Sequence, residues 1–431
     1  MTTTRNDAVT AGGKVAKPLK MGMIGIGVGG AEMLLLMEVA PEVDLMSGAD
    51  INPVTRQRFK ERYPNTRVYD SAEALCKDPD VEGVWISSPN RFHAEHTILA
   101  LEHGKNVVVE KPMALNLQQA EQMIRAAEKN GVKLMAGHTR AYTHPIRAMR
   151  KIIQSGRLGR LCGINVIAYT DWMLRPRSAD ELDPAQGGGI PYRQGPHQID
   201  TIRVLGGGKL RSVRANVGQW MPERPIPGYY AGYMEFEDGT PVTLVHNGYG
   251  YFLGAELVPW GVSAQRYNLD QRLQVRKEME TGTRNEEADK QDLRIGGEAE
   301  DREFRRYTPA GKPWVPEDLG LLIVSCERGD IRHSAHGLYV YDDDGIHDID
   351  LTPDRIMGGS GQRRAELEEF YEAVRGGATL HHDGNWGMGT LEATLALMAS
   401  AKAHKEVQLT HQVALSPDYD ANFTFPYLEG K

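Results

Sequence analysis

The sequence predicts an α/β domain with a doubly wound parallel sheet, followed by an α+β domain with a large, mostly antiparallel open sheet. Short apolar runs alternate with helical patterns over residues 20–140, as parallel strands and their crossover helices do. A glycine-rich turn joins the first of these runs to a helix. The second domain is predicted by two long alternating runs, 229–237 and 241–251, which meet at the hairpin signal Asp238-Gly239.

The elements of the first domain follow in order from these runs. Its strands are expected at residues 21–26, 43–49, 83–87, 106–109 and 132–136. Its helices are expected at residues 31–39, 92–102 and 117–129.

The pattern changes character after about residue 140. Helices are expected at residues 144–155, 194–205, 362–375 and 388–404. Strands are expected at residues 162–169, 211–220, 229–237, 241–251, 321–327, 337–341 and 347–351.

These elements divide the chain into two folded parts. We expect a disordered tail at 1–19, a nucleotide-binding Rossmann domain at 20–140, and a substrate and oligomerisation domain at 141–431. Residues 265–315 are rich in charged side chains and have little apolar periodicity. Their composition favours an insertion that is poorly ordered or depends on a partner.

Composition excludes several classes of function. The chain has 431 residues, 40% of them hydrophobic, and a formal net charge of -8, which argues against a nucleic-acid binder. No apolar run is long enough to span a membrane. Three scattered cysteines fit a reducing, cytoplasmic setting. His381-His382-Asp383 lacks metal-ligand spacing, so no metal is expected. We expect a homo-oligomer, either dimer or tetramer.

The turn after the first strand predicts dinucleotide binding. Gly25 allows a tight turn, Gly27 lets a pyrophosphate approach the backbone, and Gly30 lets helix and strand pack closely. Asp50 ends the second strand, where an acid meets the adenosine ribose hydroxyls. That carboxylate favours NAD over NADP, although Arg56 is a nearby cation.

A second motif, Glu110-Lys111-Pro112, follows the fourth apolar run, at 106–109. Ligands of open parallel sheets bind at the carboxyl ends of the strands, so Lys111 is expected near the nicotinamide. An ammonium there can bind a substrate hydroxyl and stabilise the alkoxide that develops as hydride leaves, or take its proton.

Together with Ser88, Pro89, Asn90 and His93, these motifs resemble the glucose–fructose oxidoreductase/inositol dehydrogenase/MocA (Gfo/Idh/MocA) family over nearly the whole chain. The resemblance implies that Lys111 is catalytic. It also implies that Ser88, Pro89, Asn90, His93, Glu110 and Lys111 lie along the cofactor.

A further match, Gly187 to Gly189 followed by His197 and Asp200, is similar to the family's active-site segment and implies that His197 is catalytic. The family's aspartate four residues before this histidine is replaced here by Arg193. A cation at that position casts doubt on a simple polyol substrate and favours an anionic one.

Other cationic residues support an anionic substrate. Arginine binds a carboxylate with two parallel hydrogen bonds. The candidate substrate-binding residues are Arg175, Arg177, Arg193, His138 and Arg140.

The segments 169–177, 183–189, 197–200 and 322–332 are most similar to the family branch that contains phthalate 4,5-cis-dihydrodiol dehydrogenase. This resemblance implies an NAD-dependent dehydrogenase that oxidises a carboxylated aromatic cis-dihydrodiol to the catechol. Two alternatives remain open: an NAD(P)-dependent sugar or cyclitol dehydrogenase, and a non-catalytic NAD(H)-binding sensor.

Overall fold

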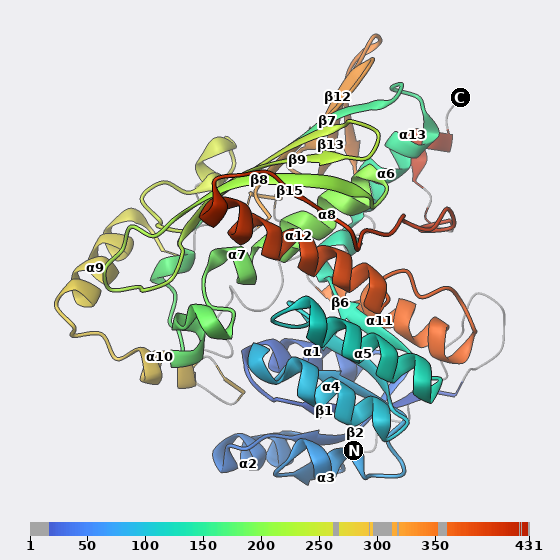
Figure 1. Cartoon of the computed structure of the whole chain (residues 1–431), viewed down its shortest axis with the longest axis vertical. Coiled ribbons are helices and arrows are strands. Elements are labelled where there is room, and N and C mark those ends of the chain that lie inside the picture. Colours follow the sequence, from blue (N-terminus) through green and yellow to red (C-terminus); the bar gives the residue numbers. More distant parts are fainter. Residues whose placement is uncertain are drawn as a thin grey trace.

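The structure is a computed structural model, shown in Figure 1. It describes residues 17–261, 267–292, 294–295, 313–316, 319–351, 360–421, 423 and 425–429. Residues 1–16 of the expected disordered tail therefore lie outside the described residues. Residues 17 and 18 lead into the first strand, which begins at Leu19.

In the described part of the chain, six parallel strands form the first sheet, in the order β3-β2-β1-β4-β5-β6. The order reverses between β1 and β4, and this opens the crevice in which dinucleotides bind in sheets of this class. The doubly wound domain is thus confirmed, with β3 as a strand that the sequence did not predict. The strands are β1 (Leu19–Ile24), β2 (Val43–Ala49), β3 (Arg67–Tyr69), β4 (Gly83–Ile86), β5 (Asn106–Glu110) and β6 (Leu134–Gly137).

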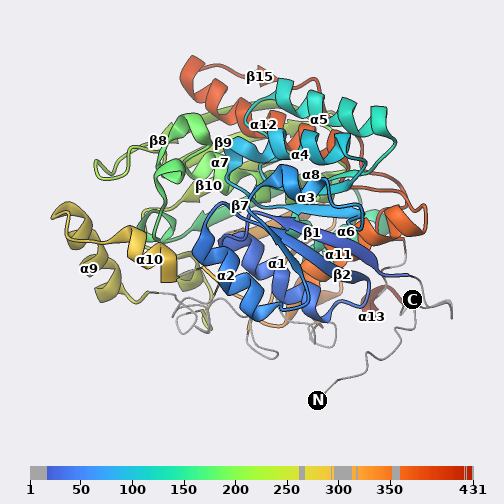
Figure 2. The same cartoon turned by 90° about the horizontal axis from the view of Figure 1, so that it is seen from below.

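Helices connect these strands and cover both faces of the sheet (Figures 1 and 2). They are α1 (Val28–Val39), α2 (Pro53–Arg62), α3 (Ala72–Cys76), α4 (His93–Glu102) and α5 (Leu117–Asn130). Helices α2 and α3 were not predicted. The start of α2 is nevertheless encoded locally, because the Asn52 side chain caps it by accepting from the N–H groups of Val54 and Thr55.

The second sheet has nine strands among the described residues, in the order β14-β13-β12-β11-β7-β10-β9-β8-β15. Strands β10 and β7 pair in parallel and the other neighbours are antiparallel, so the mostly antiparallel sheet is confirmed. The hairpin expected at Asp238-Gly239 joins β9 to β10. The strands are β7 (Leu161–Tyr169), β8 (Leu210–Gly218), β9 (Tyr229–Phe236), β10 (Pro241–Asn247), β11 (Leu321–Cys326), β12 (Gly329–His333), β13 (Gly337–Asp342), β14 (Gly345–Asp350) and β15 (Val407–Gln408).

The last long helices of the chain return to the first domain. In Figure 1, α12 lies between the second sheet and α5. Leu367 and Phe370 of α11 are fully buried in the apolar cluster that contains α1. The first domain is therefore completed by residues from the far end of the chain. The helices of the second domain are α6 (His144–Ser155), α7 (Ile190–Arg193), α8 (Gly195–Gly206), α11 (Ser360–Arg375), α12 (Gly384–Ala403) and α13 (Pro426–Glu429).

Part of the charged segment 265–315 is helical. Its described residues form α9 (Leu269–Glu280) and α10 (Glu286–Asp292), and residues 296–312 lie outside the described ranges. Glu286 pairs with Arg224 of the second domain at 2.8 Å. The carbonyl of Ile295 accepts from Arg58 of α2 at 3.2 Å, so the segment contacts both domains (Figure 2). As for membranes, none of the described helices is long and apolar enough to cross one.

Candidate active site

The turn between β1 and α1 carries the three predicted glycines. Gly25 has a φ of +85°, and a Cβ there would lie 2.5 Å from the backbone nitrogen of Ser88. A Cβ on Gly30 would lie 2.5 Å from the carbonyl oxygen of Gly25, so only glycine lets α1 begin this close to the strand. Gly27, which precedes α1, faces open space: a Cβ there meets no atom within 4 Å. The first N–H groups of α1 therefore fit a pyrophosphate.

Asp50 lies at the end of β2, beside this turn. Its carboxylate accepts from the backbone N–H groups of Ile26 at 2.9 Å and Asn52 at 2.8 Å. Arg56 lies at the same corner, where its Nη1 donates to the carbonyls of Asp50 at 2.8 Å and Ile51 at 3.0 Å. The carboxylate is thus fixed where the sequence places the adenosine ribose, with a guanidinium close by.

His93 links two loops of the first domain. It was expected beside the nicotinamide, but its side chain is buried. Its Nδ1 lies 2.8 Å from the carbonyl oxygen of Pro112, and its Nε2 lies 2.7 Å from that of Ser88. With both ring nitrogens on backbone carbonyls, His93 ties the loop after β4 to the loop after β5. Its place along the cofactor stays a prediction.

Asn90 and Arg91 join the two domains. The Nδ2 of Asn90 donates to the carbonyl of Gly187 at 3.4 Å, and Arg91 Nη1 donates to Gln186 Oε1 at 2.6 Å. Pro89, just before them, is exposed. The loop after β4 is thus held against the glycine segment of the second domain.

Lys111 reaches from the end of β5 into the second domain. Its Nζ donates to the carbonyl oxygen of Arg193, the last residue of α7, at 3.0 Å. Glu110 was expected at the cofactor, but its carboxylate pairs with Arg363 of α11 at 3.1 Å. Burial would raise the pKa of Glu110, yet Arg363 and Lys111 together hold it below the ordinary value. Glu110 therefore orients the strand end, and Lys111 alone of the pair faces Arg193.

His197 lies in the first turn of α8, four residues beyond Arg193. The predicted histidine thus follows closely along the chain on Arg193, whose carbonyl Lys111 contacts. Arg140 lies in the 3₁₀ turn Thr139–Tyr142, directly after His138 and Thr139.

His138, predicted to bind substrate, directly follows β6 and is only 2% exposed. Neither ring nitrogen has a hydrogen-bond partner within the described ranges. Burial lowers the pKa of His138 to about 4, against the opposing effect of Asp200. The ring is therefore neutral at pH 7 and enclosed beneath the site.

Arg175 and Arg177, predicted to bind the substrate carboxylate, are engaged by the protein itself. Arg175 Nε donates to Asp171 Oδ1 at 2.9 Å. The Arg177 guanidinium lies 3.5 Å from the ring centroid of Trp172 and donates to Glu181 Oε1 at 3.3 Å. Burial lowers the pKa of Arg177 to about 9, and Glu181 opposes the change. Protein carboxylates thus bind both guanidiniums, and with Arg193 these arginines form what we call the cationic wall. Substrate binding by Arg175 or Arg177 stays a prediction.

Arg193 is the most available cation of this wall. Its Nη1 lies 3.8 Å from Glu181 Oε1, which is an ion pair but beyond hydrogen-bonding distance. Its buried Nε has no hydrogen-bond partner in the part of the chain that is described. The side chain keeps 19% of its surface exposed. Because Lys111 contacts the carbonyl of the same residue, an anion held by Arg193 would lie close to the lysine.

A buried polar network lies behind the site. Tyr142 OH donates to Glu369 Oε2 at 2.8 Å, and His382 Nδ1 lies 3.1 Å from the same oxygen. Burial opposes protonation of His382, but Glu369 raises its pKa to about 9. His382 belongs to the triplet His381-His382-Asp383, and its imidazolium is the counter-ion of the Glu369 carboxylate. Among the described residues, no group of three or more His, Cys, Asp or Glu side chains forms a metal site.

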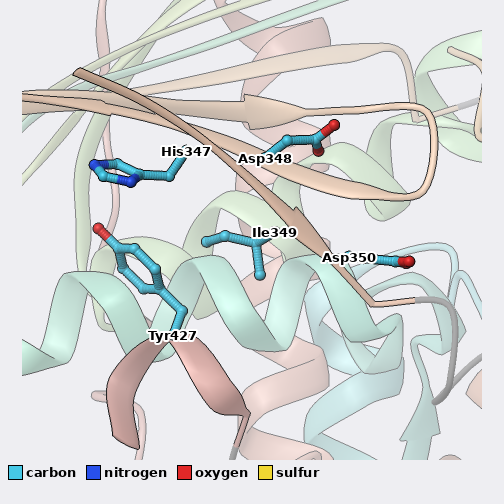
Figure 3. A pocket seen from close by; sticks show the side chains of 5 residues that line it. All are labelled: His347, Asp348, Ile349, Asp350 and Tyr427. Atoms are coloured by element: carbon cyan, nitrogen blue, oxygen red, sulfur yellow. The ribbon is translucent and has the colours of Figure 1, made fainter. Parts of the chain in front are cut away.

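One surface hollow lies away from all of these residues. It is formed by β14 and α13, where the side chains of His347 and Tyr427 face each other (Figure 3). None of the residues predicted for the site lines it. The lining residues are His347, Asp348, Ile349, Asp350 and Tyr427.

Sequence reasoning missed Glu181, Lys290 and Glu369. Glu181 does carry a local signal, because Ser178 three residues earlier forms a capping box with it. That pattern predicts a helix start and says nothing about the cations that the carboxylate meets. Lys290 and Glu369 find their partners 109 and 13 residues away, and no periodicity encodes such pairs.

Two family models match the chain. Residues 19–138 match the model described as "Oxidoreductase family, NAD-binding Rossmann fold" (GFO_IDH_MocA). Residues 146–251 match the "GFO/IDH/MocA C-terminal domain".

Individual proteins are similar over most of the chain. A 1-carboxy-3-chloro-3,4-dihydroxycyclohexa-1,5-diene dehydrogenase from Comamonas testosteroni is 32% identical over 89% of this chain and 95% of its own length. An NADP(+)-dependent scyllo-inositol 2-dehydrogenase from Bacillus subtilis is 24% identical over 91% of this chain and 96% of its own. The crystal structure of a Bordetella bronchiseptica protein assigned as a dehydrogenase superposes with a TM-score of 0.81 at 32% identity, over 91% of this chain and 100% of that one. A levoglucosan dehydrogenase in complex with NADH and levoglucosan shares the fold, with a TM-score of 0.69 at 19% identity, over 91% and 99% of the two chains.

Proposed function

Because the chain belongs to the Gfo/Idh/MocA family of NAD-dependent oxidoreductases, we propose that it oxidises a carboxylated aromatic cis-dihydrodiol, of the phthalate 4,5-dihydrodiol type, to the catechol. The observation that carries the proposal is the pairing of Lys111 with Arg193. The Lys111 Nζ contacts the backbone carbonyl of Arg193, and the Arg193 guanidinium is the most available cation of the cationic wall. A substrate that bears both a hydroxyl and a carboxylate matches that pair of groups.

The Comamonas relative supports this choice of substrate class. The compound in its name carries one carboxyl group and two neighbouring hydroxyl groups on a ring. Arg193 supports it independently, since the guanidinium takes the position where the family's sugar-type motif has an aspartate.

Lys111, His197 and Arg193 have separate roles in the proposed reaction. Lys111 binds the reacting hydroxyl and stabilises its developing negative charge. His197 accepts the hydroxyl proton, and Arg193 holds the carboxylate so that the carbinol C–H faces the crevice. When bound, the oxidised nicotinamide supplies the acceptor for the hydride. The resulting ketone tautomerises to the catechol, and the regained aromaticity drives the reaction.

We propose NAD rather than NADP as the cofactor. The Asp50 carboxylate would repel a 2′-phosphate and can accept hydrogen bonds from ribose hydroxyls. The Arg56 guanidinium at the same corner is the feature that favours NADP, and the scyllo-inositol relative is NADP(+)-dependent by name.

The second candidate is a sugar or cyclitol dehydrogenase, which the scyllo-inositol and levoglucosan relatives favour. NADH formation at 340 nm separates the two when purified protein is given phthalate and chlorobenzoate cis-dihydrodiols beside inositol and glucose. Turnover of a carboxylated dihydrodiol is the expected result, and turnover of the polyols alone would overturn the proposal. NADH binding without turnover of any compound would favour the sensor.

Lys111→Ala tests the assigned catalytic role. We expect kcat to fall by about 100- to 10,000-fold, the usual contribution of a positioned acid or base. The affinity for NADH, measured by fluorescence titration, should change little, because the lysine contacts the second domain and not the glycine turn. An equal loss of turnover and of NADH affinity would contradict the role.

We also propose that two or four copies associate through the face of the second sheet that α8 and α12 leave uncovered. Ile167 and Tyr233 on that face are 36% and 43% exposed. Light scattering coupled to size exclusion would show a mass of one chain, 47.8 kDa, if this is wrong.

A further inference from the structure

Glu181 is a buried carboxylate that three cations surround. Its Oε2 lies 2.6 Å from Lys290 Nζ and also accepts from the backbone N–H of Ser178 at 2.9 Å. Its Oε1 lies 3.3 Å from Arg177 Nη1 and 3.8 Å from Arg193 Nη1. Burial would raise the pKa of Glu181, but Arg177 and Lys290 hold it far below the ordinary value, so the carboxylate is charged.

These four side chains carry an excess of two positive charges. The carboxylates of Asp171 and Glu286 do not offset this excess, because Asp171 is paired with Arg175 and Glu286 with Arg224. Side-chain exposures of 9% for Arg177, 13% for Lys290 and 19% for Arg193 leave little water to solvate the excess. Buried charge without a partner is costly, so this wall favours an anionic ligand.

The three cations differ in how firmly they are held. Lys290 makes a short hydrogen-bonded pair with Oε2, and Arg177 is fixed by Oε1, the ring of Trp172 and the Trp172 carbonyl. The Arg193 guanidinium has only the long contact with Glu181. The buried Nε atoms of Arg193 and Arg177 both lack a hydrogen-bond partner among the described residues, so the difference lies in the other contacts. Glu181 is therefore largely neutralised by the other two cations.

We propose that Lys290 is a positioning residue that determines specificity for a carboxylated substrate. By occupying Glu181, it keeps Arg193 available for the substrate carboxylate beside Lys111. This inference rests on the proposed function and extends it to a residue outside both regions, 19–138 and 146–251, that match the family models.

The position of Lys290 makes the charged insertion part of the site. Lys290 lies on α10, which Glu286 anchors to Arg224 and to the backbone N–H of Arg177. These contacts hold the helix against the segment that carries Glu181. Without Lys290, Glu181 would draw Arg193 into a closer pair, and the wall would lose one positive charge.

The test measures phthalate binding to the NADH-loaded protein, through the fluorescence of bound NADH. Lys290→Met should weaken phthalate binding about ten-fold, as expected for removing a unit charge several ångströms from an anion in a half-buried site. Lys290→Arg, which keeps the charge, should restore most of the affinity. Lys277→Met on α9 is the matched control, because it removes the same charge from an exposed position of the insertion.

Equal phthalate affinity in Lys290→Met and Lys277→Met would overturn the inference. If Lys290→Met does not fold, Glu181→Gln is the deciding variant. It removes the carboxylate that competes for Arg193, so phthalate should bind about ten-fold more tightly. Unchanged or weaker phthalate binding would overturn the inference. If the wild-type protein binds phthalate no better than neutral phthalamide, the site does not select an anion, and the proposed function itself would be contradicted.

Discussion

Replacing His382 with glutamine should change how stability depends on pH. The fully buried His382 pairs with the largely buried Glu369, and the carboxylate raises the histidine pKa to about 9 from an ordinary value of 6.5. A histidine whose pKa is higher in the folded state stabilises the fold below its unfolded pKa. That contribution disappears as the pH rises through the folded pKa. The contribution of His382 to the free energy of unfolding is therefore lost between pH 6.5 and 9.

The size of the effect follows from the pKa difference. Each pKa unit corresponds to about 1.4 kcal/mol, so a difference of roughly two and a half units corresponds to about 3 kcal/mol. The unfolding entropy of a chain of this length converts that free energy into a fall in Tm of about 3 °C.

The assay is scanning calorimetry of wild type and His382→Gln at several pH values from 6 to 9.5. The variant should be less stable at pH 6, and the gap should close by pH 9.5. Glu366, whose pKa burial raises to about 8, titrates in the same window, so the informative quantity is the difference between the two proteins. A gap that stays constant across the range would refute a charged His382 in the folded protein.

Two further predictions concern the cofactor corner and the joint between domains. Asp50→Asn removes the charge that opposes a 2′-phosphate while Arg56 stays in place, so the ratio of kcat/KM for NADP to that for NAD should rise about 10- to 100-fold; an unchanged ratio in steady-state kinetics would contradict the assignment of Asp50. Phe370→Ala empties a fully buried site between α11 and the first domain, at a cost of about 3–5 kcal/mol. The Tm should fall by about 3–6 °C, and a drop below about 1 °C would mean that α11 is only loosely attached.

The parallel strands and the nucleotide turn could be predicted because their signals are local. Apolar runs mark β1, β2, β4 and β5, and the glycine spacing marks the start of α1. Helix α2 escaped prediction because Phe59 is its only fully buried apolar side chain, and the remaining positions are mostly charged. Helices α9 and α10 escaped for a similar reason: the contacts that hold them include ion pairs such as Glu286 with Arg224 and Lys290 with Glu181, and such pairs leave no periodic pattern.

The site was predictable in its residue types and less so in their roles. Lys111 could be placed because it follows a strand at the carboxyl edge of a parallel sheet. The roles of Arg175 and Arg177 could not be read, because a sequence shows that an arginine is present but not that Asp171 or Glu181 already binds it. His93 shows the same limit, since its two carbonyl partners belong to the backbone and have no signature in the sequence.

The return of α11 to the first domain has a consequence for synthesis on the ribosome. The apolar side of α1 is sealed by Leu367 and Phe370, which are made roughly 230 residues after β6 has emerged. At usual elongation rates this interval is roughly 10–50 s, during which the nascent nucleotide-binding domain exposes an uncovered apolar face. A chain interrupted within the second domain would keep that face exposed, and we expect such fragments to need chaperones to stay out of aggregates.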